Sequence, residues 1–151
     1  MATIDCDFSH DPTDLPRLVE ATSRAGIALG SRYVPGGGTE NWGALRRFVS
    51  RGGSVYARAV LGIPVHDTTS GFKVYRREVL EAIAPARIES RGYAFQIETV
   101  YRAIRKGFTV EEVPIRFTDR TVGGSKMGAG IVLEAMTRVP ALRLAAARGK
   151  L

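Results

Sequence analysis

The sequence lacks the features that mark secreted, membrane-spanning and zinc-binding proteins. Cys6 is its one cysteine, so a disulfide within the chain is impossible and a reducing compartment is expected. No apolar run approaches the roughly 18 residues of a membrane-spanning helix. No second histidine lies near His10 in the sequence, which argues against zinc. The sequence also contains no nucleophile elbow, P-loop or G-x-G-x-x-G motif, so these routes to catalysis or nucleotide binding are excluded.

The composition is that of one globular domain with a basic surface. Of the 151 residues, 44% are hydrophobic and 25% are charged, which favours a folded chain with a real core. The net charge of +7 favours an anionic partner, such as nucleic acid, anionic lipid or a phosphorylated substrate. Nucleic acid ranks last, because the basic residues are dispersed over several loops and no recognition motif is present. We therefore expect a single domain over residues 1–151.

Short apolar segments alternate with helical patterns along the chain. This alternation predicts an α/β domain with a mostly parallel sheet and flanking helices. The first predicted helix follows Asp14 as N-cap, ends at Gly26 and buries a face that includes Leu18 and Val19. Pro114 indicates that its strand lies at an edge or contains a bulge. The other predicted strands end at residues 3–4 or span 27–30, 72–75 and 110–117, and the other helices span 44–61, 76–83, 95–106 and 129–147.

Asp5 and Asp7 follow directly after a predicted strand end. Ligands of open α/β sheets bind at the carboxyl ends of strands, and two carboxylates can share Mg²⁺ or Mn²⁺ there. The alternative is a turn with two solvated aspartates, and the pattern alone leaves both interpretations open. Cys6, between the two acids, is expected to be a small buried residue.

Basic residues recur at three places beside the predicted loops. Arg32 follows a strand end, Arg46 and Arg47 lie at the start of a helix, and Arg120 and Lys126 share one polar loop. Because adjacent residues on a helix point in different directions, one of Arg46 and Arg47 is expected to reach a ligand while the other is solvated. Each residue taken singly reads as a surface charge. Together they predict a clamp for a phosphate group.

Two further segments carry polar side chains suited to a sugar. Residues 67–72, DTTSGF, supply hydroxyl groups and the carboxylate of Asp67, and the alternative is an ordinary Ser-Gly turn. Gln96 and Glu98 lie at a helix start, where Glu98 also suits the helix dipole. The last helix, at about 129–147, is predicted to be amphipathic and basic. It suits an anionic membrane surface and equally a core position with a solvated basic face.

These segments, taken in order, closely resemble the polyprenol (dolichol) phosphate mannosyltransferases of glycosyltransferase family 2. The resemblance spans nearly the whole chain. It is carried by DCDFSHDP at 5–12, GSRYVPGG at 30–37, NW at 41–42, RR at 46–47, SRG at 50–52, DTTSGF at 67–72, GYAFQIE at 92–98, VPI at 113–115 and SKM at 125–127.

The resemblance implies a GT-A (Rossmann-like) fold and a complete reaction. The family transfers mannose from GDP-mannose to a polyprenyl phosphate with inversion, at the cytoplasmic face of the membrane, and this chain would attach there peripherally. Carried over position by position, the D-x-D motif and its neighbour would bind Mg²⁺ or Mn²⁺ through Asp5, Asp7 and Ser9. The acceptor phosphate would be bound by Arg32, Arg46, Ser50, Arg120 and Lys126. Asp5, Asp7, Asp67 and Gln96 would take part in catalysis, with Glu98 near the sugar.

The chain also departs from the family pattern. The stretch of the catalytic domain that holds the guanine, the ribose and part of the diphosphate has no counterpart here. We therefore expect the C-terminal portion of a GT-A catalytic domain, inactive alone and able to pair with a chain that supplies the N-terminal part. The alternatives are a polyprenyl-phosphate glucosyltransferase, and a non-catalytic module that binds polyprenyl phosphate or an anionic membrane.

Overall fold

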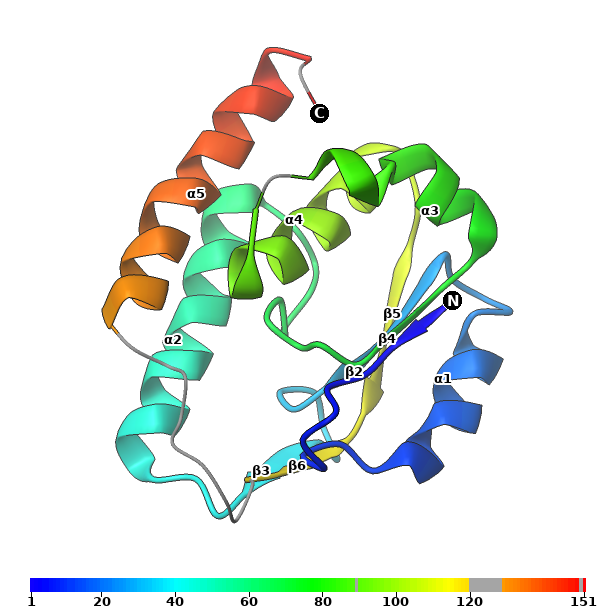
Figure 1. The fold of residues 1–151 in the computed structure, drawn as a ribbon, viewed down its shortest axis with the longest axis vertical. Helices are drawn as coiled ribbons and strands as arrows, with labels where there is room; N and C mark the ends of the chain where they lie inside the picture. The colour runs from blue at the N-terminus through cyan, green and yellow to red at the C-terminus, as the bar shows by residue number, and fades with distance from the viewer. Residues whose placement is uncertain (89, 120–128, 150) are drawn as a thin grey trace.

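The computed structural model describes residues 1–88, 90–119, 129–149 and 151, and these form a layered α/β structure (Figure 1). Its elements are β1 (Ala2–Thr3), η1 (Pro12–Asp14), α1 (Leu15–Ala21), β2 (Ile27–Ser31), β3 (Gly38–Glu40), α2 (Ala44–Leu61), β4 (Lys73–Tyr75), α3 (Arg77–Ile83), η2 (Pro85–Arg87), α4 (Gly92–Arg105), β5 (Val110–Pro114), β6 (Arg116–Thr118) and α5 (Ala129–Ala147). The predicted α/β class is confirmed.

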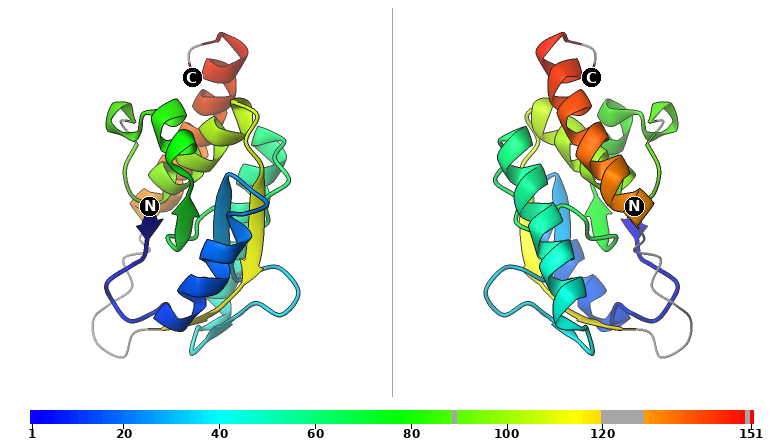
Figure 2. Two further views of the ribbon diagram at one scale, coloured as in Figure 1. Left: turned by 90° about the vertical axis from the view of Figure 1, so that its right-hand side faces the viewer. Right: turned by 90° about the vertical axis from the view of Figure 1, so that its left-hand side faces the viewer.

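A four-stranded sheet in the order β1-β4-β2-β5 lies at the centre. Strand β2 is buried along its whole length, and its alternating side chains face two separate cores. Ala28 packs with Leu18 of α1 on one face, whereas Leu29 packs with residues of α2, α4 and α5 on the other. Figure 2 shows α1 on one side of the sheet and α2 and α5 on the opposite side.

The prediction of a mostly parallel sheet needs correction. Strands β2 and β5 are parallel, as are β3 and β6 in a second, two-stranded sheet, but β4 runs antiparallel to both β1 and β2. The reason is the connection after α2. Residues 62–72 carry the chain back to the C-terminal end of β2, where the Gly30 amide donates to the Phe72 carbonyl at 2.9 Å. Strand β4 therefore starts where β2 ends and runs in the opposite direction, so the sheet is mixed.

Most predicted element boundaries agree with the structure. The helices predicted at 44–61 and 129–147 are α2 and α5, whereas α4 begins at Gly92, three residues earlier than predicted. The strand predicted at 110–117 divides into β5 and β6, and Pro114 ends edge strand β5 as expected.

The first helix differs in its cap and in its buried face. Asp14 makes no side-chain capping bond, and Asp11 instead accepts from the Thr13 amide to cap η1. Val19 is 52% exposed, because α1 is only seven residues long and Leu18 and Ala21 already fill its contact with the sheet.

Helix α5 packs against α2 and α4. Val139 and Leu142 are buried in the core that includes Leu29, while Met136 and Leu144 are exposed. The described part of α5 thus contributes to the core. Among the described residues, no helix is both long and apolar enough to cross a membrane.

Candidate functional site

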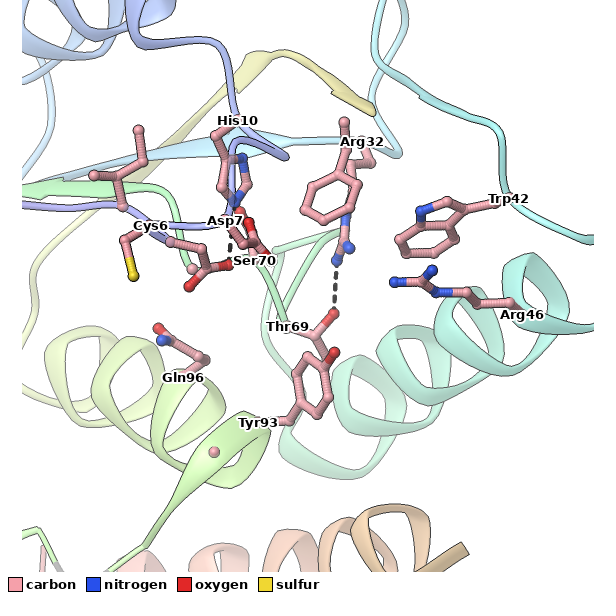
Figure 3. A pocket seen from close by; sticks show the side chains of 15 residues that line it. Cys6, Asp7, His10, Arg32, Trp42, Arg46, Thr69, Ser70, Tyr93 and Gln96 are labelled. Carbon is pink, nitrogen blue, oxygen red and sulfur yellow. Dashed lines mark hydrogen bonds and ion pairs between the residues drawn. The ribbon is translucent and has the colours of Figure 1, made fainter. Parts of the chain in front are cut away.

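A cavity of about 460 Å³ lies where the loop after β1, the end of β2 and the starts of α2 and α4 converge (Figure 3). This volume is in the range of ligand-binding pockets. The loop before β4 and strand β6 complete its walls. The described residues that line it are Ile4, Asp5, Cys6, Asp7, His10, Arg32, Trp42, Arg46, Thr69, Ser70, Gly71, Gly92, Tyr93, Gln96 and Phe117.

Asp5 reaches this cavity and is oriented by a buried histidine. Its Oδ2 lies 3.3 Å from Nε2 of His10, whose ring packs between Phe72 and Phe117 at centroid distances of 5.2 and 4.9 Å. The hydrogen bond from His10 lowers the pKa of Asp5, although partial burial opposes this shift. A Cβ at residue 71 would lie 2.8 Å from Asp5 Oδ1, so glycine leaves the carboxylate the space it occupies. Sequence reasoning missed this role of His10.

Asp7 lies on the same wall, two residues along the loop. Its Oδ1 accepts from the backbone amide of Ser9 at 3.2 Å, across Phe8, whose φ of 60° is left-handed. Ser9 is buried and does not line the cavity. Cys6 is exposed and lines the cavity, contrary to the predicted buried position, because β1 already ends at Thr3 and the chain is no longer in a strand.

The donor set on this wall fits a divalent cation only in part. Two carboxylates, one of them with a lowered pKa, are ligands that Mg²⁺ and Mn²⁺ prefer. Within the described ranges, no group of three or more His, Cys, Asp or Glu side chains could complete a metal cage. A cation held by Asp5 and Asp7 would therefore need water or ligand oxygens for its other positions, as is usual for Mg²⁺ beside phosphates.

Arg32 also lines the cavity, and it is held by Asp67. Nε and Nη2 of Arg32 donate to the two Asp67 oxygens at 2.7 Å each, and the Arg32 backbone amide donates to Oδ2 at 3.0 Å. Arg32 Nη2 also donates to Thr69 Oγ1 at 2.8 Å. Burial alone would lower the pKa of Arg32, but the charge and hydrogen bonds of Asp67 raise it above the ordinary value. Asp67 itself is fully buried and does not line the cavity.

Arg46 forms the opposite wall together with Trp42. Its guanidinium carbon lies 4.2 Å from the centroid of the Trp42 ring, and Nη1 forms an ion pair with Asp119. Arg47 is exposed, so the two neighbouring arginines point in different directions, Arg46 into the cavity and Arg47 into solvent; contact of Arg46 with a ligand stays a prediction.

The remaining predicted phosphate ligands do not line the cavity or are not described. Ser50 is buried away from it, where its hydroxyl oxygen accepts from Tyr33 at 2.6 Å. Arg120 and Lys126 lie outside the described residues.

Lys73, which sequence reasoning did not select, is bonded to Gln96, a residue that lines the cavity. Its side chain is fully buried in β4, and Nζ donates to the backbone oxygen of Gln96 at 3.0 Å and to Oε1 at 2.7 Å. Burial lowers the pKa of Lys73 to about 7, against the opposing charges of Asp67 and Asp5. A lysine within a predicted buried strand was the signal that could have pointed to it. Glu98 faces away from the cavity and pairs with Ser90 and Arg102.

The protein that carries this cavity can be assigned to a family by its sequence. Residues 1–84 match the model described as glycosyl transferase family 2. The chain belongs to glycosyltransferase family 2. Together with the α/β architecture, this membership confirms the expected GT-A type of fold.

Two curated relatives extend the family likeness. The chain is 47% identical over 140 residues to the "Polyprenol monophosphomannose synthase" of Mycolicibacterium smegmatis, a match that covers 92% of the chain and 53% of the relative. It is 45% identical over 146 residues to the "Undecaprenyl-phosphate mannosyltransferase" of Micrococcus luteus, which covers 97% of the chain and 60% of the relative. The chain thus spans little more than half the length of these family members.

In this family member the cavity brings together distant parts of the predicted site. Asp7 and Gln96 lie toward one side, and Arg46 with Trp42 lies on the other, with Arg32 between them (Figure 3); Asp5 also lines the cavity. The acids and the arginines therefore share one cavity. Such an arrangement can bind two anionic groups at once, one through a cation and one through guanidinium groups.

Proposed function

We propose that this chain is the metal-binding and acceptor-binding part of an inverting mannosyltransferase that uses GDP-mannose and polyprenyl phosphate. The observation that carries the proposal is that Asp5, Asp7, Arg32 and Arg46 all line one cavity. The names of the two relatives, a polyprenol monophosphomannose synthase and an undecaprenyl-phosphate mannosyltransferase, support mannose as the sugar and a polyprenyl phosphate as the acceptor.

The chemistry needs little from a general base. A phosphate monoester has a second pKa of about 6, so the acceptor is largely dianionic near neutral pH. An acceptor oxygen attacks the anomeric carbon from the face opposite GDP, and the carbon–oxygen bond to the diphosphate breaks. GDP leaves with that electron pair, so the configuration at the anomeric carbon inverts.

The residues of the cavity position the two anions for this step. Arg46 and Arg32 orient the acceptor phosphate and offset its repulsion from the donor diphosphate. Asp5 and Asp7 would hold Mg²⁺ or Mn²⁺, which would supply charge neutralisation on the departing GDP. Asp67 acts indirectly, because it holds the guanidinium group of Arg32 in place. Ser9, Ser50, Arg120 and Lys126 remain candidates for contacts formed once ligands are bound.

The basic surface suits a location at the cytoplasmic face of an anionic membrane, where the lipid acceptor resides. We further propose that the chain does not catalyse transfer alone, because it spans only about half of each relative. Binding of polyprenyl phosphate without transfer is the second candidate function, and the two arginines at the cavity, Arg32 and Arg46, favour it.

Transfer of labelled mannose from GDP-mannose to a short-chain polyprenyl phosphate with Mg²⁺ tests the proposal. Two proteins are assayed: the chain alone, and the joined protein, in which the chain is fused to the part of the Mycolicibacterium smegmatis relative that the match does not cover. We expect transfer only by the joined protein, and a loss of at least about 100-fold on Asp7→Asn, since charge stabilisation contributes on this scale. Asp14→Asn, at an exposed ion pair with Arg17, is the matched control and should retain full activity.

Each other outcome has a definite meaning. Turnover by the short chain alone overturns the expectation of inactivity. A folded joined protein that binds polyprenyl phosphate but transfers no sugar favours the binding module. Transfer of glucose from a nucleotide-linked glucose in place of mannose assigns the chain to the glucosyltransferase alternative.

A further inference from the structure

The hydrogen bond between Lys73 and Gln96 determines which atom of the Gln96 side-chain amide can face a ligand in the cavity. While Lys73 is protonated it has three donors and no acceptor, so the group that faces it from Gln96 is then the amide oxygen. The structure has this arrangement, with Nζ 2.7 Å from Oε1, and the same Nζ donates to the Gln96 backbone oxygen at 3.0 Å. The two bonds fix both the side chain and the first turns of α4 relative to β4.

Lys73 is suited to this task by its own surroundings. Its side chain is fully buried, and its strand pairs with β1 on one side and with β2 on the other. The charges of Asp67 and Asp5 favour its protonated form, against the larger effect of burial, which lowers its pKa. A side chain enclosed in this way has few alternative rotamers, so the position of its ammonium group is defined by the sheet rather than by a flexible surface.

This hydrogen bond also determines the position of the amide nitrogen of Gln96. Gln96 lines the cavity and extends from α4 toward Cys6 on the D-x-D side (Figure 3). With Oε1 turned to Lys73, the amide nitrogen Nε2 is the polar atom left for a ligand. No hydrogen bond between described residues uses Nε2, so none of them occupies this donor.

We propose that Lys73 is a positioning residue that makes Gln96 present an N–H donor, rather than a carbonyl acceptor, to an oxygen of a bound sugar phosphate. The inference rests on the proposed function, whose donor contains a sugar phosphate, and it adds the residue that sets the polarity of this wall. A ligand oxygen that accepts a hydrogen bond is favoured at this position. A carboxylate at residue 96 would repel the same oxygen.

The test is a titration of the 151-residue chain with mannose 1-phosphate and Mg²⁺, followed through the side-chain amide resonances of Gln96 by NMR. In the wild type the Gln96 amide signals should shift as the ligand binds. Gln96→Glu retains an oxygen toward Lys73 but replaces the N–H donor, so it should weaken binding more than tenfold while the fold persists. Lys73→Met frees the amide to rotate and should weaken binding about fivefold, the value of one ordinary hydrogen bond.

Two controls separate positioning from a merely structural effect. Lys106→Met removes an exposed lysine at the end of α4 and should leave affinity and the Gln96 signals unchanged. In a Gln96→Glu background, Lys73→Met should cause no further fivefold loss, because Lys73 acts through Gln96. Equal affinity of folded Lys73→Met and the wild type would overturn the positioning role, and Gln96→Glu tests the N–H donor even where Lys73→Met does not fold.

The outcomes distinguish this inference from the proposed function. Equal affinity of the wild type and Gln96→Glu, or Gln96 amide signals that ignore the ligand, overturns the inference even where the joined protein transfers mannose. Absence of transfer by the joined protein, with the Gln96 signals still responding to mannose 1-phosphate, overturns the proposed function and retains the inference for a sugar-phosphate site.

Discussion

The buried ion pair between Arg32 and Asp67 supports the strongest stability prediction. Asp67 accepts three hydrogen bonds from Arg32, with donor–acceptor distances of 2.7, 2.7 and 3.0 Å, and both side chains are almost fully buried. Asp67→Asn retains the shape but leaves the guanidinium charge unpaired and places an amide N–H against it. Removal of one partner from such a pair costs about 3–5 kcal/mol. Since whole domains are stable by only about 5–15 kcal/mol, this loss is a large share.

Urea unfolding followed by circular dichroism measures the loss. In a thermal melt the same cost lowers Tm by roughly 6–20 °C for a chain of this size. Glu111→Gln is the matched control, because it breaks an ion pair with Arg24 that is as short, at 2.6 Å, but exposed to solvent. Arg32→Met combined with Asp67→Asn should cost less than Asp67→Asn alone, because no unpaired cation remains. Equal losses for Asp67→Asn and Glu111→Gln would refute the reasoning.

Two further predictions concern Lys73, which holds Gln96, and Gly37, which lies against the Ser31 carbonyl. Burial lowers the pKa of Lys73 to about 7, against 10.5 as its ordinary value, so between these pH values the unfolded chain binds more protons than the folded chain. The free energy of unfolding should therefore rise with pH across this window, by up to about 1.4 kcal/mol per pH unit. Urea unfolding at several pH values measures this rise, and Lys73→Met should flatten it. Parallel pH dependences of the wild type and Lys73→Met would contradict the burial of a titrating amine. A Cβ at Gly37 would lie 2.5 Å from the Ser31 carbonyl oxygen, whereas one at Gly38 meets nothing within 4 Å. Gly37→Ala should cost about 1–3 kcal/mol and Gly38→Ala far less, and similar melting temperatures for the two variants would count against this packing.

Local pattern was enough to predict most elements of the fold. The helical spacing at 44–61 and the uninterrupted apolar run at 27–30 are properties of neighbouring residues, and both elements appear where expected. The direction of β4 was not predictable in this way. It depends on the path of residues 62–72 back to the C-terminal end of β2, and no local preference encodes that path.

The candidate site shows the same division. The D-x-D motif and the arginines at 32 and 46 were identified from residue type and order, and the structure places all four side chains at one cavity. Their supporting partners were not identified, namely His10 for Asp5 and Lys73 for Gln96, and Asp67 was assigned to the sugar rather than to Arg32.

The sequence by itself thus determined the alternation of strands and helices, the family resemblance and the kinds of group available for chemistry, because these depend on residues close together in the chain. Only the tertiary structure decided which charged groups face ligand and which hold another side chain. Lys73 and Gln96 are 23 positions apart, and Arg32 and Asp67 are 35 apart. Once the sheet and helices remove such groups from water, each must find a partner within hydrogen-bond distance, and that partner is set by the packing of elements rather than by sequence spacing.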